Sequence, residues 1–521
     1  MPSRLRNSDE YELINRGDSD DISDLDEADF QSNGASSSLY VNREQPSPRL
    51  KSFLSSVLPR RLGRSLKGGL HRKSQARTTR RPRRRICRPT GRTCFLFPVV
   101  VGIIVALVVG TSILRPSYTS PPAHYAALRT TIESSMEYGR GNSDGQKIFI
   151  AASLYDLGGD LLGGSWGQSV LQLIDILGNQ NVFLSIYENN SGPDARIAQV
   201  RFEQSVQCKH SIVFDKDFTV DDAPPIELPD GTERVKRISY LAELRNKALL
   251  PLEDKSSIRY DKILFLNDVI FDPVEATQLL FSTNLDDNGH TSYRAACAVD
   301  FINPFKFYDT YATRDAEGYS MGVPFFPWFS TAGNGISRKD VLSGKDAVRV
   351  KSCWGGMIAW DAKPFLSSKP LRFRASPDLY WDASECCLIN ADLMNEGNIN
   401  EKGEYVGIYV NPFIRVGYSE TTLRWLAFTR RFESLYTIPH NIVNHLAGMP
   451  RFNPRRTEVA GSTVEEKVWI SDKGLKEGGS FQTHTRKATG DGFCGVRMLQ
   501  LMKERPEEGE RSWEIMSIPA G

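Results

Sequence analysis

The sequence lacks the short motifs that mark several large enzyme classes. No Gly-x-Gly-x-x-Gly run follows the first predicted strand, and no phosphate-binding loop ending in Gly-Lys-Ser or Gly-Lys-Thr is present. Cysteines with Cys-x-x-Cys zinc spacing are also absent. These absences remove the usual sequence support for a dinucleotide-dependent dehydrogenase, a nucleoside triphosphatase or a zinc module.

The first 93 residues contain few aromatic residues and many serines. An acidic stretch runs from Asp18 to Asp29, and a basic stretch follows from Arg60 to Arg92. A segment of this composition cannot bury enough apolar surface to offset the entropy of its chain. The sequence therefore predicts a disordered tail over 1–93.

The segment 94–114 contains no charged residue. With a rise of ~1.5 Å per residue, about 21 residues span roughly 30 Å, the thickness of a bilayer core. A buried core helix of this length normally contains polar residues, and a cleaved signal peptide lies nearer the first residue. The segment therefore predicts a transmembrane helix that anchors the chain in a membrane.

Charge on the two sides of this segment predicts its orientation. Fourteen Lys and Arg residues and no Asp or Glu lie between Arg60 and Arg92, whereas only Arg115 follows closely. The positive-inside rule places the N-terminus in the cytoplasm, which is a type II topology. Subtracting these fourteen charges from the net +2 leaves −12 for the rest of the chain. The large domain therefore has no net basic charge for nucleic acid, and the basic stretch suits anionic lipid.

If the domain lies in the lumen, its cysteines are in an oxidising compartment. Six cysteines follow the anchor and allow up to three disulfides, with fifteen full pairings left open; they are Cys208, Cys297, Cys353, Cys386, Cys387 and Cys494. The sequon Asn189-Asn190-Ser191 makes Asn189 a predicted glycosylation site, provided that the domain is lumenal.

Strands alternate with helices at the start of the predicted domain. The segment 115–146 contains Pro121-Pro122 and polar residues, which suits a stem. Apolar patterns then predict strands at 147–154, 181–187, 211–214 and 262–267, and helices at 166–177, 194–206 and 238–250. This alternation predicts a parallel α/β sheet. The domain is expected to run over 147–449, followed by a loosely ordered tail at 450–521.

Polar residues at the end of the fourth predicted strand are the first site candidates. Ligands of open α/β sheets bind beyond the carboxyl ends of the strands, where this strand places Asn267 and Asp268. Hard oxygen ligands suit Mn²⁺ or Mg²⁺ held together with a diphosphate. The alternative for Asp268 is a cap before a turn. Arg245 has the planar fork that binds phosphate, and its alternative is an exposed helix arginine.

Later segments supply further candidates. Trp354 suits stacking on a sugar, and the adjacent Gly355-Gly356 allows close backbone approach, although a plain turn with a core tryptophan is equally compatible. Asp382 and Glu385 lie at i and i+3, as either an acid–base pair or a helix capping box. His440 and His445 are candidates for a late metal or phosphate contact.

In this order, the motifs resemble those of the fungal capsule-associated proteins, a glycosyltransferase family that includes cryptococcal alpha-1,3-mannosyltransferases. The resemblance covers roughly 147–449 and rests on the segments 153–162, 244–246, 265–269, 297–301, 353–357 and 381–385. It implies a type II Golgi enzyme with a GT-A-like, nucleotide-sugar-binding Rossmann-type sheet and helices on both faces. It also implies transfer of mannose from GDP-mannose to a glycan acceptor, with a divalent cation.

The resemblance assigns roles with one departure. Many GT-A enzymes carry Asp-x-Asp where this chain has Asn267-Asp268-Val269, so Asp268 is expected to hold the metal alone, with Asp272 or Asp300, or with His440. The implied donor-binding residues are Arg245, Asn246, Asn267 and Asp300, and the implied catalytic residues are Asp382 and Glu385.

Two other functions stay open at this point. A glycoside hydrolase would use Asp382 and Glu385 as its paired carboxylates and would need no metal. A non-catalytic scaffold for polysaccharide assembly or export would keep the fold without the reaction.

Overall fold

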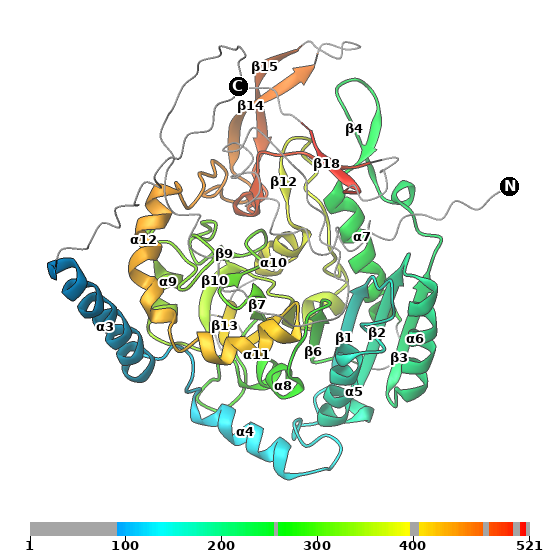
Figure 1. The fold of residues 1–521 in the computed structure, drawn as a ribbon. Coiled ribbons are helices and arrows are strands. Elements are labelled where there is room, and N and C mark those ends of the chain that lie inside the picture. Colours follow the sequence, from blue (N-terminus) through cyan, green and yellow to red (C-terminus); the bar gives the residue numbers. More distant parts are fainter. Residues whose placement is uncertain (1–90, 255–258, 396–405, 472–478, 504–510, 517–521) are drawn as a thin grey trace, which may run out of the picture. The chain divides into compact units, whose positions relative to one another are not determined.

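The computed structural model describes residues 91–254, 259–395, 406–471, 479–503 and 511–516. The predicted tail 1–93 therefore lies almost entirely outside the described residues. From Val105 onward the described chain forms one unit. Its centre is a mixed sheet in the order β3-β2-β1-β6-β11-β7-β13-β10-β9, with β8 paired to β7 (Figure 1).

Most strands of this sheet run in one direction. Strands β1 (Ile148–Leu154), β2 (Val182–Asn189), β3 (Lys209–Asp215) and β6 (Lys262–Leu266) are parallel. Strand β11 (Met357–Asp361) runs antiparallel to both β6 and β7 (Ala295–Asn303), and β13 (Ile408–Gly417) is parallel to β7. The remaining strands of the sheet are β8 (Lys306–Phe307), β9 (Arg314–Asp315) and β10 (Val348–Ser352). The predicted α/β class is confirmed, but the sheet is mostly rather than wholly parallel.

Helices cover both faces of the sheet. Successive residues of a strand point to opposite faces, and each face carries apolar side chains that must be buried. In β1, Phe149 and Ala151 join one apolar cluster, which includes residues of α7 (Arg237–Leu249) and α10 (Glu385–Asn395). Ile148 and Ile150 join the other cluster, with residues of α5 (Ser165–Leu177) and α8 (Pro273–Ser282). The sheet is therefore a buried middle layer.

The sequence patterns predicted the ends of seven elements to within about two residues, namely β1, β2, β3, β6, α5, α6 and α7. The remaining helices and strands lie mainly in later or peripheral segments: α3 (Gly91–Leu114), α4 (Ala123–Ser134), α6 (Pro193–Ser205), α9 (Ile336–Leu342), α11 (Glu420–Thr429), α12 (Thr437–Leu446), β4 (Pro225–Glu227), β5 (Glu233–Val235) and β12 (Asp382–Ala383).

The predicted anchor, 94–114, falls within α3, whose side chains are described from Pro98 onward. Its Val, Ile and Leu side chains are mostly exposed. Among the residues that the structure describes, no helix combines the length and the apolar character needed to cross a membrane.

Much of the predicted stem, 115–146, is packed on the domain. Tyr118 is buried, donates from its hydroxyl to Val341 O at 2.9 Å and lies edge-on to Phe413. Tyr125 and Ile132, on α4, are also buried. The polar and Gly-containing composition concealed these three apolar contacts.

The C-terminal segment also belongs to the domain, in contrast to the predicted loose tail. Strands β14 (Thr463–Ser471) and β15 (Gly479–Lys487) form a hairpin, and β16 (Gly495–Val496) pairs with β12. Strands β17 (Gln500–Met502) and β18 (Trp513–Ile515) pair with each other. The structure thus uses the segment as a cover over α7 and α10.

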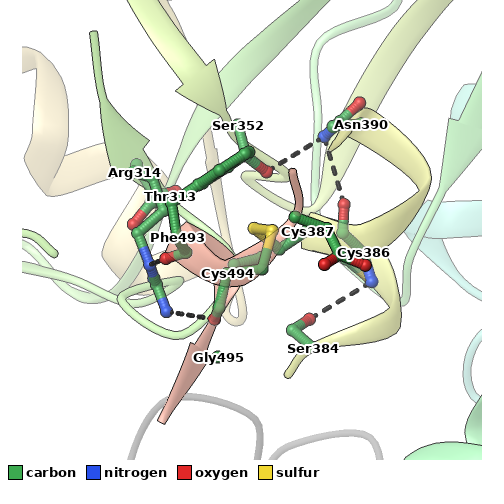
Figure 2. The surroundings of a disulfide bond; sticks show 12 residues. Thr313, Arg314, Ser352, Ser384, Cys386, Cys387, Asn390, Phe493, Cys494 and Gly495 are labelled. Atoms are coloured by element: carbon green, nitrogen blue, oxygen red, sulfur yellow. Dashed lines mark hydrogen bonds between the residues drawn. A yellow bond between two sulfur atoms is a disulfide. The ribbon is translucent and has the colours of Figure 1, made fainter. Parts of the chain in front are cut away.

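Two disulfides hold distant segments together. Cys297 is bonded to Cys353, and Cys387 is bonded to Cys494 across 107 residues of sequence (Figure 2). Cys208 and Cys386 are free and buried. The second disulfide ties α10 to the C-terminal segment.

Removing the second disulfide should destabilise the domain without changing its sheet. We expect the double substitution Cys387→Ser and Cys494→Ser to lower the free energy of unfolding by about 2–4 kcal/mol, because the unfolded chain regains the entropy of a long loop. Urea unfolding of the full-length chain in detergent measures the change. The matched control is Cys208→Ser, which removes a buried thiol without opening a disulfide. Equal midpoints for the two variants would contradict the expectation.

Candidate functional site

The carboxyl ends of the parallel strands bring the candidate residues to one edge of the sheet. Ligands bind at this edge in open α/β sheets because the strand ends and the following loops converge there. Asn267 and Asp268 follow β6, Glu188 is the last residue but one of β2, and Asp300 lies near the end of β7. Strand β11 enters from the same edge, since its first residue, Met357, pairs with the last residue of β6.

Three predicted site residues meet there in one hydrogen-bonded group. Arg245, on α7, donates from Nε to Glu385 Oε1 at 2.8 Å and from a terminal nitrogen to Asn267 Oδ1 at 3.2 Å. Arg245 is only 4% exposed and Glu385 is fully buried. The structure therefore joins a predicted donor-binding arginine, a predicted donor-binding amide and a predicted catalytic carboxylate.

Trp354 packs against the guanidinium group of Arg245. The guanidinium carbon of Arg245 lies 4.8 Å from the centre of the Trp354 ring, a cation–π contact. The indole is itself buried between Phe265 and Phe373, with ring centres 5.3 and 5.8 Å away. The prediction that Trp354 offers a free face to a sugar is therefore wrong: the ring holds an arginine in place.

The two glycines after Trp354 are required by contacts within the chain. Gly355 and Gly356 have φ of 60° and 66°, which side chains rarely adopt. A Cβ atom on Gly355 would lie 2.0 Å from Ala298 O, and one on Gly356 would lie 2.7 Å from Val269 Cγ1. The close approach predicted for a ligand is made instead to neighbouring strands and loops.

Behind this edge lies a pair of buried carboxyl groups. Asp300 Oδ1 accepts from Asp309 N at 3.1 Å, and its Oδ2 accepts from Tyr418 OH at 3.3 Å. Burial, followed by the charge of Asp309, raises the pKa of Asp300 to about 8, and burial also raises the pKa of Asp309. The pKa of Tyr418 is raised by burial and then by charges that include Asp268. Asp268 therefore acts on the same tyrosine that donates to Asp300.

This arrangement can accommodate a divalent cation only with help from a ligand. Within the described ranges, no group of three His, Cys, Asp or Glu residues is placed to hold a metal. Asp268 is half-buried, Asp300 is fully buried, and the charges of both act on Tyr418. One or two carboxylates, completed by phosphate oxygens and water, are a usual set for Mg²⁺ and chemically similar ions. The donor set thus fits a cation that arrives with a diphosphate.

His440 is not available as a metal ligand. Its Nδ1 accepts from Arg338 at 2.9 Å, and its Nε2 lies 3.2 Å from Val323 O. Because the ring is buried and both nitrogens are occupied, the predicted metal role of His440 is wrong. Asp272, the alternative partner of Asp268, accepts from Val274 N at 2.8 Å and caps α8.

Two other predicted site residues have structural partners. Asp382 is buried, lies 3.0 Å from Lys236 Nζ and accepts from Gln500 N at 2.6 Å. Asn246 exchanges two hydrogen bonds with the backbone of Phe373, at 2.9 and 2.8 Å. Neither residue joins the Arg245 group. The predicted pairing of Asp382 with Glu385 is therefore wrong.

The capping-box alternative for these two carboxylates is also wrong. Ser384 Oγ, rather than Asp382, accepts from Cys386 N at the start of α10 (Figure 2). Glu385 therefore begins the helix, and its carboxylate turns inward to Arg245.

The sequon residue Asn189 is fully buried at the end of β2. Its side-chain nitrogen donates to Tyr240 OH at 3.1 Å. A glycan at this position would have to replace that contact and could not fit in the native fold. The predicted glycosylation of Asn189 is therefore contradicted.

Glu188, next to it, was not predicted from the sequence. It is fully buried, burial raises its pKa to about 7, and neither carboxylate oxygen makes a well-formed hydrogen bond within the described residues, although the Ser191 hydroxyl lies near. Such a group at the carboxyl edge is a candidate for contact with a polar ligand. The available signal was a glutamate at the end of an otherwise apolar strand.

Comparison with known proteins gives the class and then the family. The family described as Cryptococcal mannosyltransferase 1 matches residues 147–392. The alpha-1,3-mannosyltransferase CMT1 of Cryptococcus neoformans is 28% identical over 175 residues, which cover 31% of this chain and 36% of that protein. A mannosyltransferase structure from Pyrobaculum calidifontis, in complex with GDP-Man and Mn²⁺, aligns with 68% of this chain and 76% of its own, at 9% identity and a TM-score of 0.29.

The region 147–392 is thus similar to a glycosyltransferase domain. The similarity is to the cryptococcal mannosyltransferase family that the ordered motifs predicted. The aligned part spans about a third of the curated relative's length.

The burial of His440 predicts a stability that depends on pH. Burial and the neighbouring Arg338 lower the pKa of His440 to about 4. Between this pH and 6.5 the histidine is protonated in the unfolded chain but neutral in the native one. The contribution of neutral His440 to the free energy of unfolding is complete above pH 6.5. As the pH falls toward 4, roughly 2–3 kcal/mol of this free energy is lost.

Unfolding of the full-length chain between pH 4 and 6.5 measures this slope. His440→Asn should have a lower stability and a flatter profile, whereas His445→Asn, which changes an exposed histidine of the same helix, should keep the wild-type slope. A wild-type slope in the first variant would contradict the assignment.

Proposed function

We propose that the chain is a membrane-attached mannosyltransferase, which transfers mannose from GDP-mannose or another nucleotide sugar to a glycan acceptor. The family match and the activity named for the cryptococcal relative support this proposal. The observation that carries it is the buried group of Arg245, Glu385 and Asn267 beside Asp268, at the edge where a sheet of this kind binds ligands.

The sheet supports a GT-A-like, nucleotide-sugar-binding fold. Four parallel strands in the order β3-β2-β1-β6 are followed by the antiparallel β11, and helices cover both faces. The nucleoside would lie over the ends of β1 and β2, where Glu188 is buried with few polar contacts. The diphosphate would lie over the end of β6.

A divalent cation, Mn²⁺ or Mg²⁺, would be held by Asp268, alone or together with Asp300. When bound, it would neutralise negative charge on the leaving diphosphate. The protein's own contribution is a fixed positive charge: Arg245 is held by Glu385 on one side and backed by Trp354 on the other. A preformed charge in a site with little water stabilises the departing phosphate without first having to reorganise.

Glu385 also has a free acceptor. Its Oε1 is bound to Arg245, whereas its buried Oε2 has no hydrogen-bond partner within the described residues. A sugar hydroxyl of the donor or acceptor would reach this oxygen only after the residues that cover it move. In the transfer, the bond from the anomeric carbon to the phosphate oxygen breaks, the acceptor oxygen bonds to that carbon, and the acceptor's proton passes to the departing diphosphate. An α-linked product from an α-linked donor would require retention.

The proposed location is the Golgi membrane, with 94–114 as anchor, the N-terminus in the cytoplasm and the domain in the lumen. The two disulfides support an oxidising compartment. The hydrolase alternative loses support because Asp382 is bound to Lys236 and Gln500 and does not face Glu385.

Replacing Asp268 tests the donor site. Full-length protein in detergent should be stabilised by GDP-mannose with Mn²⁺, by about 2.7 kcal/mol at a hundredfold excess over the dissociation constant. Asp268→Ala should abolish both this thermal shift and mannose transfer, while its melting temperature without ligand stays near wild type. Asp272→Ala, which removes a helix cap instead, is the control and should retain the shift.

Wild-type protein that binds no nucleotide sugar would favour the scaffold alternative. Normal transfer by Asp268→Ala would contradict the role of Asp268.

Two buried carboxylates separate catalysis from folding. Glu385→Gln and Asp382→Asn each disrupt a buried ion pair, so we expect both to lose about 3–5 kcal/mol of stability. At a temperature where both remain folded, only Glu385→Gln should also lower kcat, because only Glu385 holds Arg245. Steady-state transfer assays measure this difference, and an equal loss of kcat in both variants would show that the effect is purely structural.

A further inference from the structure

Helices α11 and α12 expose large apolar side chains on the surface of the domain. Trp425 and Phe428, on α11, are 54% and 53% exposed. Ile438, Ile442 and Leu446, on α12, are 76%, 57% and 79% exposed. The three residues of α12 recur every fourth position and therefore share one side of the helix. These five side chains are here called the α11–α12 face.

The two helices are joined by a short segment that continues the apolar surface. Phe428 contacts Phe432 with ring centres 4.9 Å apart, and Tyr436 contacts the exposed Phe305 at 6.4 Å. Soluble domains seldom leave apolar side chains grouped in this way without a partner. The face therefore requires an occupant.

The chain that leaves the apolar segment 94–114 is fastened beside this face. Ser117 N donates to Arg430 O at 3.1 Å, and Ser434 Oγ donates to Arg115 O at 2.9 Å. Arg430 in turn donates to Tyr118 O at 3.0 Å. Both Arg430 and Ser434 lie between α11 and α12.

This fastening limits the distance from the apolar segment to the face. Ser117 is the third residue after Leu114, and an extended chain covers at most about 3.6 Å per residue, so the span is at most roughly 11 Å. If 94–114 lies in a bilayer, the junction of α11 and α12 lies at its surface. No flexible stem can lift this side of the domain away.

The chemistry around the face suits lipid headgroups. Tryptophan is favoured at the membrane–water interface, and Arg side chains are attracted to anionic lipid. The exposed ionisable side chains from Ser419 to Arg451 are Arg424, Arg431, Arg451, His445 and the single acid Glu420. A protein partner would not need this combination to lie beside the membrane entry point.

We propose that the α11–α12 face docks on the lipid bilayer and holds the domain flat against it. The proposal rests on the membrane anchor of the proposed function and goes beyond it. The domain is then attached at two places: a helix in the bilayer and an apolar surface on it. Its candidate site would keep a fixed orientation relative to the membrane.

Quenching by brominated lipid tests the docking. Full-length chain is inserted in phosphatidylcholine–phosphatidylserine vesicles with bromine on the acyl chains, which quenches nearby tryptophan. Segment 94–114 contains no tryptophan, so the anchor itself adds no signal. Wild-type protein should be quenched, and Trp425→Phe should lose most of this quenching. Trp469→Phe, on the β14–β15 hairpin, is the matched control and should keep it. Equal quenching in wild type and Trp425→Phe overturns the proposal.

A second variant keeps the outcomes distinct. Ile438→Glu, Ile442→Glu and Leu446→Glu change only exposed side chains, so the fold should persist, and quenching of Trp425 should be lost. Alkaline extraction of the vesicles tests the anchor independently. Protein that resists extraction but shows no quenching overturns the docking alone. The oligomeric state in nanodiscs is compared for the two proteins. If the wild-type protein forms dimers and the triple variant does not, a second copy covers the face and the lipid proposal is overturned.

Discussion

The ion pair between Arg245 and Glu385 determines how the candidate site is built. Taking both charges out of water is costly, and a buried pair of this kind persists only when further contacts satisfy the remaining atoms. Here Asn267 accepts from the guanidinium, and Trp354 covers its face. Helix α7, helix α10 and the end of β6 must therefore be in register at the same time. The positive charge exists in place before any ligand arrives.

The parts of the fold that local sequence determines were predictable. Strands β1, β2, β3 and β6 and helices α5, α6 and α7 follow from apolar periodicity, whose pattern is visible within a few residues. The short strands β4 and β5, which lie between β3 and α7, were not predicted. Arg245, Asn267, Asp268 and Glu385 were named from motif order and resemblance. Asp268 is next to Asn267 in sequence, but Arg245 and Glu385 meet although they lie 140 positions apart. No local pattern contains that information.

The errors share the same physical cause. Trp354, His440 and Asp382 have residue types that suit a site, but distant partners occupy them: Arg245, Arg338 and Lys236. Asn189 satisfies a sequon, but a buried strand end contains it. Composition was equally misleading at both ends of the domain, where a few buried aromatic and apolar residues fix segments that otherwise look like linkers. Glu188 was overlooked because a single carboxylate at the end of a strand has no motif.

The bond between Cys387 and Cys494 has a consequence for biosynthesis. Helix α10 carries Glu385 two residues before its disulfide, and the partner cysteine lies near the end of the chain. During translation, the helix waits for more than a hundred further residues before this covalent link can form. A chain interrupted after β13 but before Cys494 would contain every strand of the central sheet without the disulfide that fixes α10. The covalent link to α10 can therefore form only after all the strands of the central sheet have been synthesised.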